Sequence, residues 1–486
     1  MSDAGENLRS RLLQLQSRFT WDLKKDDLEL DDLSRQLQHD IDLGLGQRGA
    51  TAHSYSFLAY VRYLQGRLQE AESLLSRSEE KTKECFGDES ELRLIVTYGD
   101  LAWLKYHTGD YTESQTYWQR VQDILVKFPV DSSTDLHPEV YGEKAWTYLK
   151  MSKSYYSKAV ECFRRALKLQ PKDCEWNNGY AIALYRTEED MTKTHLEESP
   201  ATKQLRHAVE INPEDGVLLS MLALKLVIYQ KHQEAAGLVE RALQVGPEDT
   251  QVIRYVSKYL RKQSQVDRSI ELLQRALKKS SPSSFLHHQL ALSYIRKKND
   301  LYSQRPCPER EVQRLRSLCI QHLEEALRLK STLNQAKAYL ALMYAEEKSK
   351  TRAQKMFNEL LEKVDEERGG VRQSIYRCYA EFCQYHSKLK EQAIEYYTKA
   401  IQFSTKTPEG KQCSKKLKKI AEQYRSWNPR GAVAYAILGT VAKAEGDWKG
   451  AAKYYEEALH RDRNNEEYLS ALCELRLQLR EEDQAS

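Results

Sequence analysis

Small and apolar residues recur along the chain with a spacing that predicts pairs of packed helices. An alanine is followed five residues later by a proline at three places in the middle of the chain: Ala166 and Pro171, Ala208 and Pro213, Ala242 and Pro247. Ala208, Ala242 and Ala276 are then 34 residues apart. Two helices approach closely only where a small residue lies at their crossing, and proline ends a helix before the next unit begins. This period is that of the tetratricopeptide unit.

Other parts of the chain carry the same unit. Near the C-terminus the first helix, the turn and the second helix are marked in order by Leu438 and Gly439, Gly446, and Ala451, Tyr455 and Ala458. Similar groups lie at 58–75, 101–118, 159–166, 235–242, 353–357 and 393–400. About nine or ten helical hairpins fit, which predicts an all-α tetratricopeptide-repeat superhelix.

The array is interrupted. The interval between corresponding alanines widens to 42 residues from Ala166 to Ala208 and to 50 residues from Ala276 to Ala326. We expect the second insertion, residues 296–311, to be an exposed loop. Residues 128–139 contain two prolines and three Ser or Thr residues, which is typical of a linker.

Composition favours helix and limits the classes of partner. Charged residues make up 30% of the chain, with 20 glycines and 11 prolines among 486 residues. The net charge is only +4, so an anion site must be local; residues 22–42 are acidic and residues 406–430 are basic. Nine cysteines without a C-x-x-C pair indicate reduced thiols. The sequence lacks a signal peptide and an apolar run of membrane-spanning length, so we expect a cytoplasmic protein without a membrane partner.

Motifs for catalysis or for metal binding are weak. Residues 44–49 spell GLGQRG, but a dinucleotide-binding turn needs a preceding strand, and the preceding residues form a polar helical pattern. His287 and His288 are adjacent, so on a helix they point about 100° apart and cannot chelate one metal ion. We therefore expect a binding protein that is not an enzyme and that needs no metal or cofactor.

Basic residues recur at helical spacing on the first helices of consecutive units. Arg254, Lys258 and Arg261 form one stripe. Three pairs and two aromatic residues accompany it: Trp146 with Lys150, Ile182 with Arg186, His288 with Gln289, and Tyr156 and Tyr255. If these helices line one wall, the cations suit a phosphorylated end with a base to stack on. The alternative is a set of solvated charges beside core aromatics.

A second basic face lies near the C-terminus. In residues 410–425, Lys411, Lys415 and Lys418 share roughly one helical face. They could follow several phosphates behind a bound end, or belong to a helix that is merely solvated.

Several strings resemble the vertebrate interferon-induced proteins with tetratricopeptide repeats. They are FTWDLKKDDLEL, SFLAYVRYLQG, GYAIALYR, RYVSKYLRK, SSFLHHQLALSY and LSALCELRL, spread from residue 19 to residue 477. The resemblance implies three helical subdomains, here 1–135, 136–330 and 331–486, that form a clamp around the 5′ end of single-stranded viral RNA. It also implies that bound RNA is kept from translation, and it leaves open assembly with family homologues.

The resemblance assigns an RNA-binding role to residues of this chain. They are Gln36, Trp146, Lys150, Tyr156, Ile182, Arg186, Arg254, Tyr255, Lys258, His288 and Gln289, to which the basic helix adds Lys411, Lys415 and Lys418. Three departures from the family pattern weaken a preference for capped RNA: Asp40 on the early helix, the loop at 44–49, and Val217 where an aromatic is common. We therefore expect 5′-triphosphate RNA to be favoured over a cap that lacks 2′-O-methylation.

One further function remains open. Tetratricopeptide arrays commonly bind peptides, so the chain could be a protein-interaction scaffold or a co-chaperone. The chaperone-tail clamp needs Asn where Lys258 stands, four residues after Arg254. RNA is thus the predicted partner, and DNA is not expected.

Overall fold

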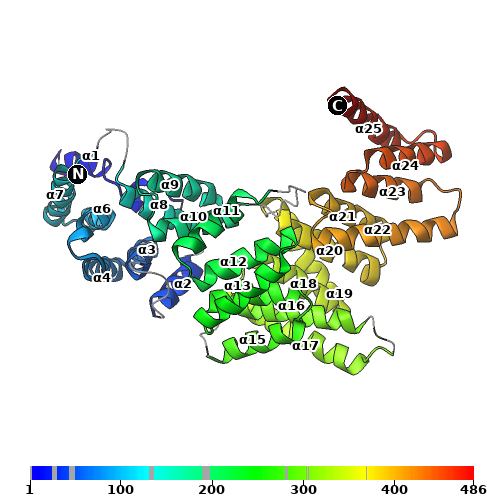
Figure 1. Cartoon of the computed structure of the whole chain (residues 1–486), viewed down its shortest axis with the longest axis horizontal. Coiled ribbons are helices and arrows are strands. Elements are labelled where there is room, and N and C mark those ends of the chain that lie inside the picture. Colours follow the sequence, from blue (N-terminus) through cyan, green and yellow to red (C-terminus); the bar gives the residue numbers. More distant parts are fainter. Residues whose placement is uncertain are drawn as a thin grey trace. The chain divides into compact units, whose positions relative to one another are not determined.

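The computed structural model describes residues 3–24, 30–42, 50–130, 136–188, 197–279, 283–302, 304, 306–367 and 369–485. Every regular element in these ranges is a helix, and no strand occurs among them (Figure 1). The prediction of an all-α fold is confirmed. None of the described helices is long and apolar enough to cross a membrane.

The described chain divides into two compact units. The first contains residues up to Glu188 and from 197 to Val252, and the second begins at Ile253. The helices of the first unit are α1 (Asp3–Leu12), α2 (Leu30–Asp42), α3 (Ala50–Leu64), α4 (Leu68–Phe86), α5 (Ser90–Arg93), α6 (Ile95–Thr108), α7 (Tyr111–Lys127), α8 (Pro138–Met151), α9 (Tyr156–Leu169), α10 (Cys174–Thr187), α11 (Pro200–Ile211), α12 (Gly216–Leu226) and α13 (His232–Val245), with a short 3₁₀ turn η1 (Arg18–Thr20).

Helix α14 (Thr250–Lys262) leads into the second unit. That unit continues with α15 (Val266–Lys279), α16 (Ser284–Leu301), α17 (Glu309–Leu329), α18 (Asn334–Glu346), α19 (Lys350–Glu362), α20 (Gly369–Phe382), α21 (Lys390–Phe403), α22 (Pro408–Trp427), α23 (Val433–Glu445), α24 (Trp448–Arg461) and α25 (Glu466–Ala485). A π-helical turn, η7 (Cys383–Ser387), joins α20 to α21.

Ten helical hairpins lie in the described ranges, in agreement with the predicted nine or ten. The alanines that defined the period are buried on the second helix of each hairpin, from Ala166 on α9 to Ala326 on α17. Gly446 ends α23 with φ +85°, a conformation that a side chain disfavours. Gly439 faces Tyr455 so closely that a Cβ would lie 2.8 Å from its ring. The small residues of the repeat pattern thus lie where helices pack closely or where a tight turn ends a helix.

The insertion between Ala276 and Ala326 is a loop only in part. α16 continues to Leu301 and α17 begins at Glu309, so the two ends of the 296–311 string are helical. The described residues between these helices are non-helical, and Tyr302, Gln304 and Pro306 are exposed as predicted. Buried contacts explain the extension: Lys298 is 1% exposed and its ammonium contacts Glu346 at 2.6 Å. The helical start of the string is therefore held in part by the buried ion pair of Lys298. The expected division at residues 135 and 330 stays a prediction.

Candidate functional site

Five residues expected at the site lie together in the first unit, on helices α8 to α10. This α8–α10 cluster consists of half-buried side chains: Trp146, Lys150, Tyr156, Ile182 and Arg186. The guanidinium of Arg186 donates to the carbonyl oxygen of Leu149 at 3.3 Å, next to Lys150 in the chain. The same guanidinium lies 5.7 Å from the ring centroid of Tyr156. Arg186 therefore lies against the last turn of α8, which also carries Lys150, and against an aromatic ring.

Trp146 contributes a buried hydrogen-bond donor to the cluster. Its ring stands edge-on to Phe163, with centroids 5.4 Å apart. Its indole N–H is buried and has no hydrogen-bond partner among the described residues. Buried donors are usually satisfied, so an orphaned N–H beside cations is suited to a ligand's acceptor.

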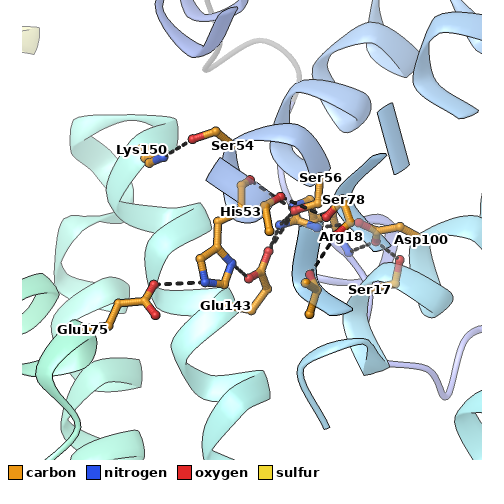
Figure 2. A network of polar contacts seen from close by, with 12 residues as sticks. Ser17, Arg18, His53, Ser54, Ser56, Ser78, Asp100, Glu143, Lys150 and Glu175 are labelled. Carbon is orange, nitrogen blue, oxygen red and sulfur yellow. Dashed lines mark hydrogen bonds and ion pairs between the residues drawn. The ribbon is translucent and has the colours of Figure 1, made fainter. Parts of the chain in front are cut away.

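A contact with α3 fixes the position of the Lys150 side chain. Its ammonium donates to the hydroxyl of Ser54 at 3.0 Å (Figure 2). Burial lowers the pKa of Lys150, and the negative charges of Asp40, Glu143 and Glu175 oppose that shift. A bound phosphate would oppose it further, because an adjacent anion favours the charged ammonium.

A buried ionic network lies beside Lys150 (Figure 2). Arg18, from η1, is 1% exposed and forms ion pairs with Asp100 on α6 and Glu143 on α8. His53, on α3, pairs with Glu143, and its Nε2 lies 3.0 Å from Oε1 of Glu175 on α10. Four helices of the first unit are thereby joined through charged side chains.

Protonation in this network follows from its geometry. Burial alone would lower the pKa of His53, but Glu143 and Glu175 outweigh it and raise that pKa to about 10. Burial alone would raise the pKa of Glu143, but His53 and Arg18 hold it well below its usual range. At neutral pH His53 and Glu143 are therefore both charged, whereas burial raises the pKa of Asp100 despite the opposing charge of Arg18.

In the second unit, α14 and α16 bring a second group of predicted residues together. This α14–α16 cluster consists of Arg254, Lys258, Arg261, His288 and Gln289. The guanidinium of Arg254 lies 4.1 Å from the ring centroid of Phe285 and 5.5 Å from that of Tyr255. Tyr255 itself is only 8% exposed, so most of its ring packs inside the unit.

Arg261 links the two helices of this cluster. Its Nη2 donates to the side-chain oxygen of Gln289 at 2.7 Å. Burial lowers the pKa of Arg261 to about 10, which leaves it charged at neutral pH. His288 is 5% exposed; burial and the neighbouring arginines lower its pKa to about 3, so it is neutral, and its Nε2 has no partner among the described residues. The cluster thus presents cations beside a neutral, unpaired imidazole nitrogen.

The residues expected to follow the RNA backbone lie on α22. Lys411 and Lys415 are exposed. Lys418 is also exposed but forms an ion pair with Glu445, 2.9 Å between Nζ and Oε1. Of the three lysines, two are thus available to an external anion.

Some expected contributors cannot be placed in full. The side chain of Gln36 and the loop at 44–49 lie outside the described residues. Asp40 is half-buried on α2 and opposes the lowering of the pKa of Lys150 by burial, so its charge acts on the predicted phosphate-binding ammonium. Val217 is half-buried at the start of α12.

Metal and disulfide chemistry find no support in the described ranges. They contain no group of three or more His, Cys, Asp and Glu side chains that could hold a metal ion. All nine cysteines lie in these ranges, and none of them forms a disulfide.

Comparison with known proteins agrees with the repeat pattern. Models described as tetratricopeptide repeat match residues 50–127, 138–173 and 434–467. The chain is 32% identical to the human "Antiviral innate immune response effector IFIT1", over 94% of this chain and 97% of that protein. It is 30% identical to human "Interferon-induced protein with tetratricopeptide repeats 2", over 90% and 92%. The chain belongs to the family of interferon-induced proteins with tetratricopeptide repeats.

Solved structures of this family share the architecture. A monomeric mutant of IFIT1 with Gppp-AAAA matches with a TM-score of 0.79 and 29% identity, covering 93% of this chain and 99% of that one. A human IFIT1 dimer with PPP-AAAA matches with a TM-score of 0.73 and 30% identity over the same shares.

Sequence reasoning did not find the ionic network of this family member. Arg18, His53, Asp100 and Glu143 are far apart in the chain, and each looks like an ordinary surface charge in its own segment. A weak signal was present, since Asp100 and Glu143 lie among apolar residues in the middle of helices that are buried on most sides. Charges on such helices must be paired.

Proposed function

We propose that the protein binds single-stranded RNA by its 5′ end in antiviral defence. The family relationship supports this, because solved structures of IFIT1 contain PPP-AAAA, m7Gppp-AAAA and Gppp-AAAA. Binding without chemical change is sufficient for sequestration, and the described residues offer no metal cluster for catalysis.

The α8–α10 cluster is the observation that carries the proposal. It combines Lys150 and Arg186 with an unpaired indole N–H on Trp146. Ammonium and guanidinium groups that are partly withdrawn from water bind phosphate oxygens more strongly than fully solvated ones. Half-buried aromatic and apolar side chains beside them suit a terminal base.

The α14–α16 cluster contributes a second set of contacts in this proposal. Arg254, Lys258 and Arg261 supply positive charge, and the unpaired nitrogen of neutral His288 can bond to a base or ribose group. Lys411 and Lys415 on α22 then contact later phosphates, while Lys418 contributes less because of Glu445.

We also propose that 5′-triphosphate RNA is favoured over a cap that lacks 2′-O-methylation. A triphosphate end carries more negative charge and needs no further aromatic enclosure. Val217 supplies a smaller apolar surface than an aromatic residue would for a cap base. In this proposal the protein acts in the cytoplasm, where bound RNA is withheld from translation. Its chain is arranged as three subdomains divided near residues 135 and 330.

The end chemistry is testable with the wild-type protein. Fluorescence anisotropy should rank labelled RNAs of one sequence in the order 5′-triphosphate, unmethylated cap, then 2′-O-methylated cap and 5′-hydroxyl. Addition of the protein to a translation extract should reduce translation of the 5′-triphosphate reporter first. Equal affinity for the 5′-triphosphate and 5′-hydroxyl RNAs would remove the proposal.

Association with another family member is proposed at α25. Leu469 and Leu477 are 53% and 62% exposed on this last helix, and a human IFIT1 dimer has been solved. Exposed leucines of this kind are typical of an interface. The double substitution Leu469→Glu and Leu477→Glu should convert any dimer seen by light scattering to monomer. A wild-type monomer at all concentrations would contradict this part.

A further inference from the structure

Two large aromatic side chains are exposed beside α22 in the second unit, and neither cluster uses them. Trp427, the last residue of α22, is 69% exposed, and Tyr385 on η7 is 52% exposed. Large rings are usually covered in folded proteins, and exposed ones that lie near each other mark interaction surfaces.

Each ring has a lysine against it. The Nζ of Lys390 lies 3.9 Å from the ring centroid of Trp427. The Nζ of Lys416 donates to the hydroxyl of Tyr385 at 2.6 Å and lies 4.8 Å from its ring centroid. The four residues Tyr385, Lys390, Lys416 and Trp427 form what we name the α22 strip.

Helix geometry places the two ends of the strip on one face. Lys416 and Trp427 are eleven residues apart on α22. At about 100° and 1.5 Å per residue, they point in nearly the same direction and are separated by about 16 Å along the axis. Lys419 and Gln423 are exposed between them.

Exposed lysines of α22 lie at the strip and next to it. Lys419 lies within about 60° of the direction of Lys416, whereas Lys411 and Lys415 point about 100–140° away, on a neighbouring face that also carries the exposed Glu422. None of Lys411, Lys415 and Lys419 forms an ion pair within the described part of the chain. Single-stranded nucleic acid is bound without sequence preference where lysines contact the backbone and bases stack on aromatic rings. A polyanionic strand offers both a charge and a flat face at every nucleotide, which an acidic protein surface does not.

We propose that the α22 strip is a second RNA contact, at which nucleotides downstream of the bound end stack on Trp427 and Tyr385. Lys390, Lys416 and Lys419 contact the phosphates between them. A stacked strand rises about 3.4 Å per nucleotide, so the separation of about 16 Å corresponds to roughly five nucleotides. The inference deepens the proposed function and rests on it for the identity of the ligand.

The test compares RNA lengths on the full chain. Trp427→Ala should weaken binding of a 5′-triphosphate RNA of about 20 nucleotides by about tenfold, the loss of one stacking partner. Binding of 5′-triphosphate tetra-adenylate should not change. Trp427→Phe, which keeps a flat ring, should retain most of the affinity. Tyr111→Ala is the matched control, because Tyr111 is 44% exposed on α7 in the other unit and should have no effect.

The outcomes separate this inference from the proposed function. Unchanged affinity of Trp427→Ala for the long RNA overturns the inference. An equal loss of affinity for the tetranucleotide also overturns it, because Trp427 would then contact the 5′ end of the RNA rather than downstream nucleotides. Capture of poly-glutamate by the wild type but not by Trp427→Ala, with RNA binding unaffected, assigns the strip to an acidic protein and also overturns it. If the wild type shows no preference for 5′-triphosphate RNA, the proposed recognition of the RNA end fails. A tenfold effect of Trp427→Ala on the long 5′-hydroxyl RNA would still support the strip in that case.

Discussion

The α8–α10 cluster and the α14–α16 cluster both hold cations partly out of water, but they balance the charge differently. In the first unit, Lys150 lies near Asp40, Glu143 and Glu175, and the neighbouring His53 is charged because of the same carboxylates. In the second unit, Arg254 faces the rings of Phe285 and Tyr255, and Arg261 bonds to an amide oxygen.

This difference separates stability from binding. Buried carboxylates fix the cations of the first unit, so removing one partner leaves the other charge buried and unpaired. Aromatic faces and amides compensate the arginines of the second unit less completely, so their positive charge remains available to an anion. We therefore expect the same chemical groups to act mainly in stability in the ionic network and mainly in ligand binding in the α14–α16 cluster.

The largest expected effect comes from breaking the network. Glu143→Ala should lower the free energy of unfolding by about 3–5 kcal/mol, because Arg18 and His53 lose their shared carboxylate while buried. Urea denaturation followed by circular dichroism measures this. Glu161→Ala, on the exposed face of α9 where the carboxylate pairs with Arg164, is the control and should cost less than about 1 kcal/mol. Similar losses in the two variants would show that the network is not special.

The pH dependence of stability tests the charge on His53. The folded-state pKa of about 10 is raised above the ordinary value of about 6.5, so the native state holds a proton that the unfolded chain releases. The stabilisation is complete below the unfolded pKa and is lost as the pH rises toward 10. The difference in unfolding free energy between the wild type and His53→Gln should shrink by about 1.4 kcal/mol per pH unit between about pH 7.5 and 9.5. A pH-independent difference would mean that His53 is neutral.

In the second unit, substitution of a cluster cation should change RNA binding more than stability. Arg261→Met should leave the free energy of unfolding within about 1 kcal/mol of the wild type, because burial already penalises the guanidinium and a thioether fills similar space. The same variant should weaken binding of 5′-triphosphate RNA by about tenfold. A loss of stability as large as that of Glu143→Ala would erase the contrast between the clusters.

The smallest effects are expected on the exposed face of α22. Lys415→Ala should weaken binding of a long 5′-triphosphate RNA by roughly threefold and reduce its salt dependence by about one counterion. Lys418→Ala should change it by less than about twofold, because Glu445 already compensates that charge. Anisotropy titrations at several salt concentrations measure both. The reverse order of the two effects would show that the ion pair opens on binding.

Local patterns in the sequence predicted much of the fold. The alanine at each helix crossing and the glycine at a tight turn are constraints within one hairpin, so Ala166, Gly439 and Gly446 identify hairpins without knowledge of their neighbours. The stripe of Arg254, Lys258 and Arg261 followed from helical spacing in the same way. The helical ends of the insertion at 296–311 did not, because the buried Lys298 among its polar residues is held by a distant partner, Glu346.

The ionic network shows the same limit more strongly. The contacts of Arg18 with Asp100 and with Glu143 join positions 82 and 125 residues apart in the chain. No periodicity links such residues, and their pairing depends on how α3, α6, α8 and η1 pack together. Single-sequence patterns can therefore identify the cations of a site, but not the buried carboxylates that fix them.

The most direct test of the central claim reverses charge in each cluster and compares binding of one 5′-triphosphate RNA. Arg186→Glu and Arg254→Glu should each weaken it by about 100-fold or more with unchanged circular dichroism. Their controls, Arg164→Glu on α9 and Arg328→Glu on α17, reverse exposed charges in the same units and should change it by less than about threefold. If the cluster variants and the controls weaken binding equally, or if none does, neither cluster recognises the RNA end.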